Sequence, residues 1–317
     1  LFVWVMDEIM REWEKRKGRR WGIKIIFRKG NTLREFFPHE WAQASDVLDL
    51  IVNWLGFADD IIFVSTFLED VIDSFQLFQQ VCATVGLEIN FSKCGLMIMN
   101  WNPETSETLK LKTEKCVKVD SHPIPVVQEY LYLGVVISNS GTFSSHVEER
   151  GRKSLGTVFG RIKSVEEWIG KNSSLLLKEL NTCFAPCLSW GTDVLTLQRT
   201  DIATLDVSFY RYLRKVFKTK FDEKTNRWDK SNKELKKLSD LNPPSETLPL
   251  ARLKFLFHTL DKEITYPVEC FLHGKICVND LFLSGDKRIK TYSQLLFRDL
   301  ENFGVLDLTR KAASKKS

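Results

Sequence analysis

Residues 55–64 place two adjacent carboxylates between two apolar runs. The flanking segments, 51–57 and 61–64, are rich in β-branched and aromatic residues, which predicts two buried strands joined by a tight turn. Asp59 and Asp60 stand at the tip of that turn. Because two neighbouring carboxylates repel each other and are costly to bury, we expect the turn to present them to solvent or to a divalent cation. An ordinary polar hairpin turn is the alternative, since Asp is common in turns.

The segment after this hairpin predicts a helix and then a short strand. Residues 66–69 read Thr-Phe-Leu-Glu, a capping box that marks a helix start. Apolar residues then recur at three- and four-residue spacing as far as Val85. Gly86 stands where the end of a helix favours a left-handed residue. The apolar run 96–99 then predicts a strand.

The acidic hairpin, the amphipathic helix and the text Gly-Leu-x-Ile-Asn-x-x-Lys together resemble the palm of a reverse transcriptase. The closest resemblance is to the polymerases of non-LTR (LINE-type) retrotransposons, whose metal-binding box reads Phe/Tyr-Ala-Asp-Asp. Residues 57–60 match that box, and residues 86–93 match the next palm motif. The strand that grips the primer in this family is matched by Tyr130, Leu131, Tyr132, Leu133 and Gly134.

The resemblance implies a two-metal nucleotidyl transfer. By this resemblance Asp59 is the principal ligand of Mg²⁺ (or Mn²⁺), and Asp60 supports the metal site or the primer end. Lys93 lies near the triphosphate, where it can donate a proton to the leaving group. These three residues are the candidate catalytic residues, and the implied partners are an RNA template, a DNA primer and deoxynucleoside triphosphates.

The same resemblance implies that part of the enzyme precedes residue 1. A helix whose early positions match Leu1 and Phe2 follows the template-positioning motif in this family. We therefore expect the fingers and the strand with the first metal-binding aspartate to lie upstream. Since two metals need carboxylates from two strands, the isolated chain is expected to have no polymerase activity.

Two basic patterns downstream are candidate nucleic-acid contacts. The helix after residue 145 has an apolar stripe of Leu155, Val158, Phe159, Ile162 and Val165, which we expect to be buried. A second stripe combines two cations with two glycines and is expected to lie along the backbone of a primer–template duplex; it consists of Arg152, Gly156, Gly160 and Lys163. Close helix–helix packing is the alternative explanation for the glycines. The second pattern is a basic helix end interleaved with aromatic residues, and its candidate contacts are Arg211, Arg214 and Lys215.

The predicted fold class is α+β. We expect a partial palm of antiparallel sheet and helices over residues 1–140, a helical thumb-like domain over 141–240, and a helical C-terminal region with a basic tail over 241–317. A helix over 173–188 is expected to be interrupted at Pro186. The resemblance extends to about residue 262 through the text Arg-Leu-x-x-Leu-x-His that begins at Arg252.

Composition and charge bear on the partners, the compartment and the metal sites that can be expected. A net charge of +5 is compatible with nucleic-acid binding without establishing it. Seven cysteines, an odd and scattered set, favour a reducing intracellular compartment. The expected location is nuclear or nucleocytoplasmic. No apolar run is long enough to span a bilayer, so no membrane association is expected. Zinc is not expected either, because structural zinc uses tighter ligand pairs than Cys270, His273 and Cys277 offer. The alternative functions are a non-catalytic nucleic-acid-binding module and a decayed remnant of a retroelement.

Overall fold

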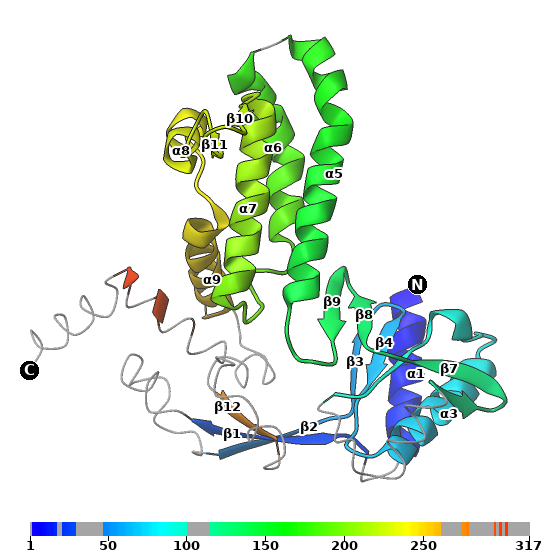
Figure 1. Ribbon diagram of the computed structural model, residues 1–317. Helices are drawn as coiled ribbons and strands as arrows, with labels where there is room; N and C mark the ends of the chain where they lie inside the picture. Colours follow the sequence, from blue (N-terminus) through cyan, green and yellow to red (C-terminus); the bar gives the residue numbers. More distant parts are fainter. Residues whose placement is uncertain are drawn as a thin grey trace, which may run out of the picture. The chain divides into compact units, whose positions relative to one another are not determined.

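The computed structural model describes residues 2–17, 21–29, 47–99, 115–170, 172–260 and 274–278, together with residues 295, 298, 299, 302 and 303. The chain divides into two compact units, which are described separately (Figure 1). The first unit is Leu1–Leu133, Ser138–Gly141 and Tyr266–Lys287, and the second is Gly134–Ile137, Thr142–Thr265 and Arg288–Ser317. Helices and small sheets confirm the predicted α+β class. The division into 1–140, 141–240 and 241–317 stays a prediction, and the basic tail lies outside the described residues.

In its described residues the first unit combines two long helices with small sheets. The helices described there are α1 (Phe2–Arg16), α3 (Leu68–Thr84) and the 3₁₀ turn η1 (Phe91–Lys93). Its strands are β1 (Ile23–Lys29), β2 (Val47–Val52), β3 (Trp54–Phe57), β4 (Asp60–Phe63), β5 (Leu96–Met97), β6 (Cys116–Val119), β7 (His122–Val127), β8 (Glu129–Tyr132) and β12 (Gly274–Val278). An antiparallel sheet has the order β12-β1-β2, β3 and β4 form an antiparallel hairpin, and β7 lies between antiparallel β6 and parallel β5.

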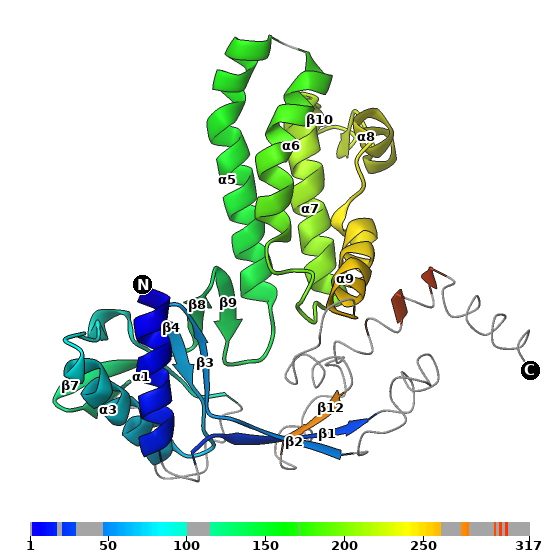
Figure 2. The ribbon, with the colours of Figure 1, turned by 180° about the vertical axis from the view of Figure 1, so that it is seen from behind.

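The core of the first unit lies between α1 and α3, which run side by side in Figures 1 and 2. Trp13 is fully buried there, and its indole N–H donates to the carbonyl oxygen of Ser74 at 2.9 Å. The ring of Phe63, at the end of β4, lies 5.3 Å from Trp13 and 5.4 Å from Phe78. Strand β4 is therefore attached to both helices through one aromatic cluster.

The second unit is mainly helical. It contains most of β9 (Val135–Ser138), followed by α5 (Ser144–Ile169), α6 (Ser173–Ser189), α7 (Arg199–Val216), β10 (Phe221–Asp222), β11 (Arg227–Trp228), α8 (Asn232–Ser239) and α9 (Pro244–Leu260). Helices α5, α6 and α7 run side by side (Figure 2). Phe184 and Tyr212 stack at 4.1 Å in the middle of this bundle, and the Tyr212 hydroxyl donates to the carbonyl oxygen of Leu177 at 3.1 Å. None of the described helices is long and apolar enough to cross a membrane.

A buried ion pair joins α9 to the last part of the second unit. Arg252 Nε lies 2.6 Å from Asp299 Oδ2, and both side chains are 1% exposed. Within the described part of the chain, both terminal guanidinium nitrogens of Arg252 and the second carboxylate oxygen of Asp299 lack a hydrogen-bond partner. The Arg252 position of the predicted motif is thus a buried structural contact.

Several local predictions were wrong. Helix α6 continues through Pro186, whose fixed φ is compatible with a helix and whose cost is offset by burial of Phe184 in the bundle. Helix α3 begins at Leu68, but no side chain caps it, so the predicted capping box at 66–69 does not form. The Ser65 hydroxyl accepts from the Phe67 N–H instead. Phe159 is 43% exposed, because the face that α5 buries is largely polar.

Candidate functional site

The two predicted carboxylates lie at the tip of the β3–β4 hairpin. Phe57 pairs with Asp60, so Ala58 and Asp59 form a two-residue turn. Ala58 has a φ of +54°, whereas the φ of Asp59 is not positive. This is the φ pattern of a type II′ turn, a turn type whose backbone twist matches that of a β-hairpin. Glycine usually fills that first position, so alanine there carries backbone strain. Asp59 and Asp60 are both exposed, as predicted for adjacent carboxylates.

The base of this hairpin is held against α1. The indole N–H of Trp54 donates to Glu14 Oε1 at 2.8 Å, and Ile61 and Phe63 pack on the core of the first unit. On the other face Leu55 and Phe57 are 52% and 65% exposed, which corrects the prediction of two fully buried strands. A two-stranded hairpin has only one packed face here, so the other remains on the surface. The tip is exposed and its base is fixed.

Two tyrosines of β8 connect the acidic tip to the Lys93 segment. The Tyr132 hydroxyl donates to the backbone carbonyl oxygen of Asp60 at 3.4 Å, and the Tyr130 hydroxyl donates to that of Lys93 at 2.8 Å. Burial, followed by the charge of Asp60, raises the pKa of Tyr132 above its ordinary value. Burial raises the pKa of Tyr130 as well, with further contributions from Cys94 and Asp60. The structure thus brings Asp60, Lys93, Tyr130 and Tyr132 into one neighbourhood.

The Lys93 segment has its own local order. Gly86 has a φ of +76° just beyond α3, as predicted for a left-handed helix end. Asn90 then caps η1, because its side-chain oxygen accepts from the N–H of Ser92 at 3.1 Å and from its hydroxyl at 2.6 Å. Lys93 ends this turn with an exposed side chain. Its position is therefore set by backbone contacts that leave the amine in solvent.

The last two residues of the predicted primer-grip motif form a turn, not a strand. Leu133 and Gly134 both have positive φ, +49° and +80°, which is the φ pattern of a type I′ turn. Leu131 and Leu133 are exposed. A Cβ on Gly134 would lie 2.9 Å from Trp190 Nε1, so this position has no room for a side chain. Gly134 belongs to the second unit, whose α5 holds it.

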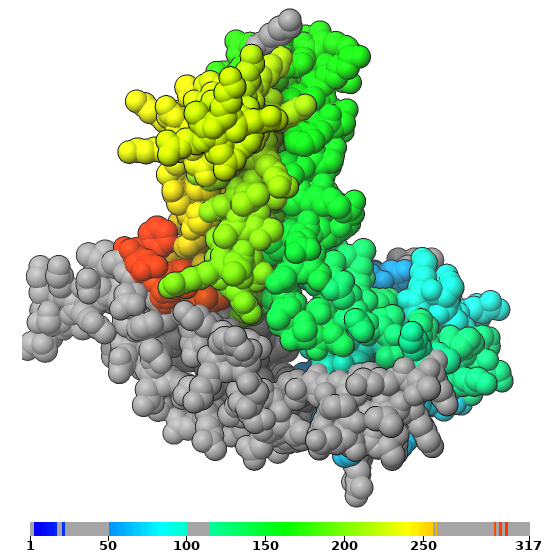
Figure 3. Space-filling view, viewed as in Figure 1, coloured from blue at the N-terminus to red at the C-terminus, as the bar shows by residue number. Residues whose placement is uncertain are grey.

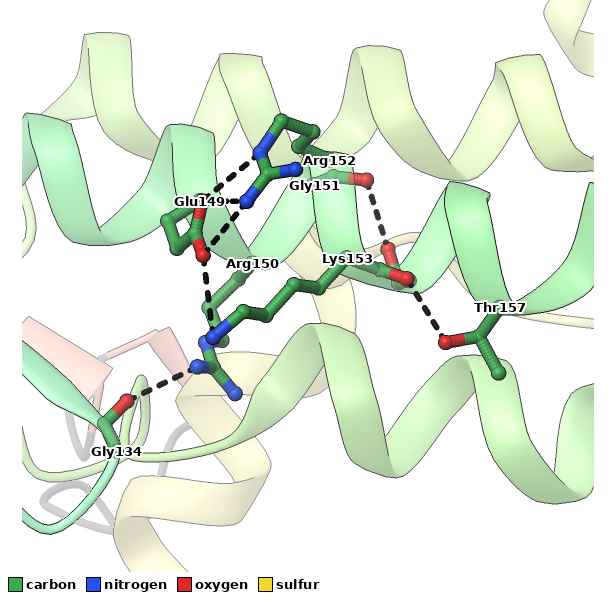
Figure 4. Close-up of polar contacts among 8 residues, drawn as sticks. Gly134, Glu149, Arg150, Gly151, Arg152, Lys153 and Thr157 are labelled. Atoms are coloured by element: carbon green, nitrogen blue, oxygen red, sulfur yellow. Dashed lines mark hydrogen bonds and ion pairs between the residues drawn. The ribbon is translucent and has the colours of Figure 1, made fainter.

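Two residues of α5 fix the segment 134–137. Arg150 donates from Nη2 to the carbonyl oxygen of Gly134 at 3.0 Å (Figure 4). His146 Nδ1 accepts from the Val136 N–H at 3.2 Å, and its Nε2 donates to the Trp190 carbonyl at 3.0 Å. Burial, the main cause, lowers the pKa of His146, and a proton on Nδ1 would break the bond to Val136. The predictions missed both residues, because an apolar stripe gives no indication of a polar buried face.

The predicted backbone-binding face of α5 is open. Arg152 makes hydrogen bonds to both carboxylate oxygens of Glu149, so part of its charge is already compensated (Figure 4). A Cβ placed on Gly156 or Gly160 would have nothing within 4 Å among the described residues. Lys163 is exposed on the same helix. Close helix–helix packing within the described chain therefore does not explain the two glycines.

The three predicted cations at the end of α7 differ in their surroundings. Arg211 is exposed. Lys215 is exposed as well, with its Nζ 5.6 Å from the ring of Phe159. Arg214 is partly buried, and its guanidinium lies 4.9 Å from the ring centroid of Trp228. Trp228 was not singled out from the sequence, although it lies among the cations that follow α7.

Comparison with known families gives a match that covers the N-terminal part of the first unit and ends within β9. Residues 1–137 match the family model for reverse transcriptase (RNA-dependent DNA polymerase). No curated protein and no solved structure matches the chain. The reverse transcriptase match includes Asp59, Asp60, Lys93 and the motif at 130–134, whereas α5 and all later helices follow it. The predicted resemblance is confirmed at the level of reverse transcriptase, and its LINE-type detail stays a prediction.

The carboxylates of the reverse transcriptase region suit a magnesium ion in number and type. Mg²⁺ is commonly held by one or two carboxylates together with substrate phosphate oxygens, and reverse transcriptases generally use Mg²⁺ or Mn²⁺. In the described ranges no group of three or more His, Cys, Asp or Glu side chains converges. Asp7 of α1, another carboxylate of this region, forms an ion pair with Arg11 at 2.8 Å. Cys270 and His273 lie outside the described residues, so the prediction about zinc stays open.

Proposed function

We propose that this chain is the palm-and-thumb part of a LINE-type reverse transcriptase. In that enzyme it adds deoxynucleotides to a DNA primer on an RNA template. One observation supports this most directly: strand β8 connects the exposed Asp59–Asp60 tip to the Lys93 segment, because Tyr132 bonds to the backbone of Asp60 and Tyr130 to that of Lys93, all inside the region that matches the reverse transcriptase model. An ordinary polar turn would not need these neighbours.

Each residue of this neighbourhood then has a role. Asp59 and Asp60 would hold the divalent ion, which when bound stabilises charge on the attacking and departing oxygens. Lys93 carries an exposed amine that can hold the triphosphate and donate a proton to the leaving group. Tyr130 and Tyr132 fix the tip and the lysine segment relative to each other through backbone carbonyls.

The second unit would hold the duplex. The surface of α5 at Gly156 and Gly160 is free of side chains from the described residues, so a sugar-phosphate backbone can approach it closely. The exposed Lys163 and Lys215 supply positive charge. Arg152 would contribute less, since Glu149 already binds it. Duplex binding should therefore weaken in a Gly156→Leu, Gly160→Leu variant more than in Arg152→Gln.

We also propose that the chain alone binds primer–template without extending it. Two-metal chemistry needs carboxylates from two strands, and among the described residues no third His, Cys, Asp or Glu side chain joins Asp59 and Asp60 in a metal-binding group. The test is primer extension on an RNA template with Mg²⁺ or Mn²⁺, run beside fluorescence anisotropy of the same labelled duplex. Asp59→Asn is compared with Asp73→Asn, an exposed aspartate on α3.

The expected result is binding without extension, with both variants binding like the parent. Templated products that disappear in Asp59→Asn but persist in Asp73→Asn would refute the inactivity and support the polymerase assignment. Absence of binding at every salt concentration would contradict both parts of the proposal and favour a decayed remnant.

A non-catalytic nucleic-acid-binding module is the second candidate. It is favoured by the charge of residues 211–237, which include eleven Lys and Arg but four Asp and Glu. Under this reading binding falls steeply with salt and does not depend on divalent ions. A salt titration with and without a chelator separates the two candidates, because metal-dependent extension belongs only to the polymerase.

A further inference from the structure

One segment of the second unit is strongly basic. Residues 211–237 carry a formal charge of +7 from eleven Lys and Arg and four Asp and Glu, whereas the whole chain carries +5. The segment runs from the end of α7 through β10 and β11 into α8. Its side chains, yellow in Figure 3, project from the surface. A polyanion is the partner that such a surface attracts.

Two aromatic rings lie on the outside of this basic segment. Phe221 of β10 pairs with Trp228 of β11, and their ring centroids are 5.2 Å apart with planes at 60°. The residues are 46% and 43% exposed, although the same bundle offers a buried core nearby. Large aromatic residues that remain on a surface among cations are typical of sites that stack bases.

The hairpin that carries the rings is well supported. Asp222 accepts from the Lys224 N–H at 2.9 Å and from the Thr225 hydroxyl at 2.8 Å, which fixes the turn. The Asp229 N–H donates to the Lys220 carbonyl at 2.9 Å and extends the strand pairing. The acid Asp222 is therefore used to shape the turn.

Arg214 contacts the indole ring of Trp228. Its guanidinium lies 4.9 Å from the Trp228 ring centroid and 6.0 Å from that of Tyr210, and it donates to Asn232 Oδ1 at 2.5 Å. Burial lowers the pKa of Arg214. A cation held in this way orients the ring and makes a cation–π contact with it, so the remaining exposed ring surface faces outward in a fixed direction.

We propose that the β10–β11 hairpin is a stacking platform for unpaired nucleic acid. Bases of a single strand stack on Trp228 and Phe221, and its phosphates are neutralised by Lys220 and Arg227, which make no ion pair with any described residue. A single strand is the favoured occupant because a duplex hides the faces of its bases in its own stack. The inference deepens the proposed nucleic-acid function and depends on it.

Lys218 differs from Lys220 and Arg227 because it makes an ion pair with a described residue. Its amine pairs with Glu166 of α5 at 2.8 Å, so it links the bundle. Substituting Lys218 should therefore affect stability more than binding. Substituting Arg227 should affect the salt dependence of binding.

The test uses the full chain, a fluorescein-labelled oligouridylate, and the same strand annealed to its complement. Trp228→Ala and Phe221→Ala are each expected to weaken single-strand binding about tenfold with the salt slope unchanged. Arg227→Gln should lower that slope by about 0.7. Trp228→Phe should keep most of the affinity and Trp228→Leu should lose it, because leucine restores apolar bulk without a ring.

Trp168→Ala is the matched control, since Trp168 is 77% exposed on α5 of the same unit. Parent-like binding by Trp228→Leu, or an equal loss in Trp168→Ala, would overturn the platform. An equal loss for duplex and single strand would overturn the choice of occupant. If single-strand binding is unchanged in the variants while primer–template still binds, only this inference fails; if neither nucleic acid binds, the proposed function fails with it.

Discussion

The open face of α5 gives a stability prediction that can be worked from the structure. Glycine inside a helix costs roughly 1 kcal/mol relative to alanine. A methyl group at Gly156 or Gly160 would meet no described atom within 4 Å, so nothing offsets the gain in propensity. Gly156→Ala with Gly160→Ala should therefore raise the unfolding free energy of the second unit by about 2 kcal/mol, or its Tm by about 4–8 °C.

Gly151 on the same helix is the matched control. A Cβ there would lie 2.5 Å from the hydroxyl oxygen of Ser208 and 3.4 Å from its Cβ. Displacing that side chain costs about 1–3 kcal/mol, which cancels or exceeds the helix gain. Gly151→Ala should therefore be no more stable than the parent.

The assay is urea unfolding followed by circular dichroism, with the duplex titration of the proposed function run on the same proteins. Greater stability together with weaker duplex binding would show that the glycines serve the ligand. A double alanine variant that is less stable than the parent would refute the reasoning, because it would mean that the face is packed.

Three further predictions concern buried or strained positions. Arg252→Leu should cost about 3–5 kcal/mol by leaving the buried Asp299 carboxylate, among the described residues, with only its longer ion pair to Arg298 at 4.0 Å, and adding Asp299→Leu should recover most of it in urea unfolding; a double variant as unstable as the single one would contradict this. Because burial lowers the pKa of His146 below its ordinary 6.5, the unfolded chain binds more protons than the folded chain as the pH falls through 6.5, and the unfolding free energy should decrease as the pH is lowered through that range. The drop should disappear in His146→Gln, and its persistence there would assign it to other groups. Ala58→Gly should stabilise the first unit by roughly 1 kcal/mol by removing left-handed strain, whereas Ala203→Gly within α7 should cost about as much; thermal unfolding showing a loss in both would contradict the turn geometry.

Sequence reasoning succeeded where a local pattern determines a local structure. The Asp59–Asp60 turn follows from strand-forming runs on both sides of two acids, and Gly86 follows from the left-handed end of α3. The apolar face of α7 is a further case of this kind, since Leu205, Phe209, Tyr212, Leu213 and Val216 recur at helical spacing and are all buried. In each case neighbours in sequence carry the information.

Features that depend on tertiary contacts were not accessible in this way. The buried face of α5 includes His146 and Arg150, which satisfy backbone groups of segments outside the helix, and Ser154, which donates to the Gly151 carbonyl of α5 itself. An apolar stripe cannot reveal such a face, and it therefore wrongly placed Phe159 inside. Trp228 is a large aromatic residue of the kind often found in cores, yet it is 43% exposed, with the Arg214 guanidinium 4.9 Å from its ring centroid.

Helices α5, α6 and α7 follow one another directly along the chain, and their buried residues form a single core. Contacts made between successive segments form early and fast, without help from remote parts of the polypeptide. The basic segment 211–237 belongs to the second unit together with this bundle, whereas the Asp59–Asp60 tip belongs to the first unit. Substitutions around Asp59 should therefore leave the folding of this helical core and the charge of its basic segment unchanged.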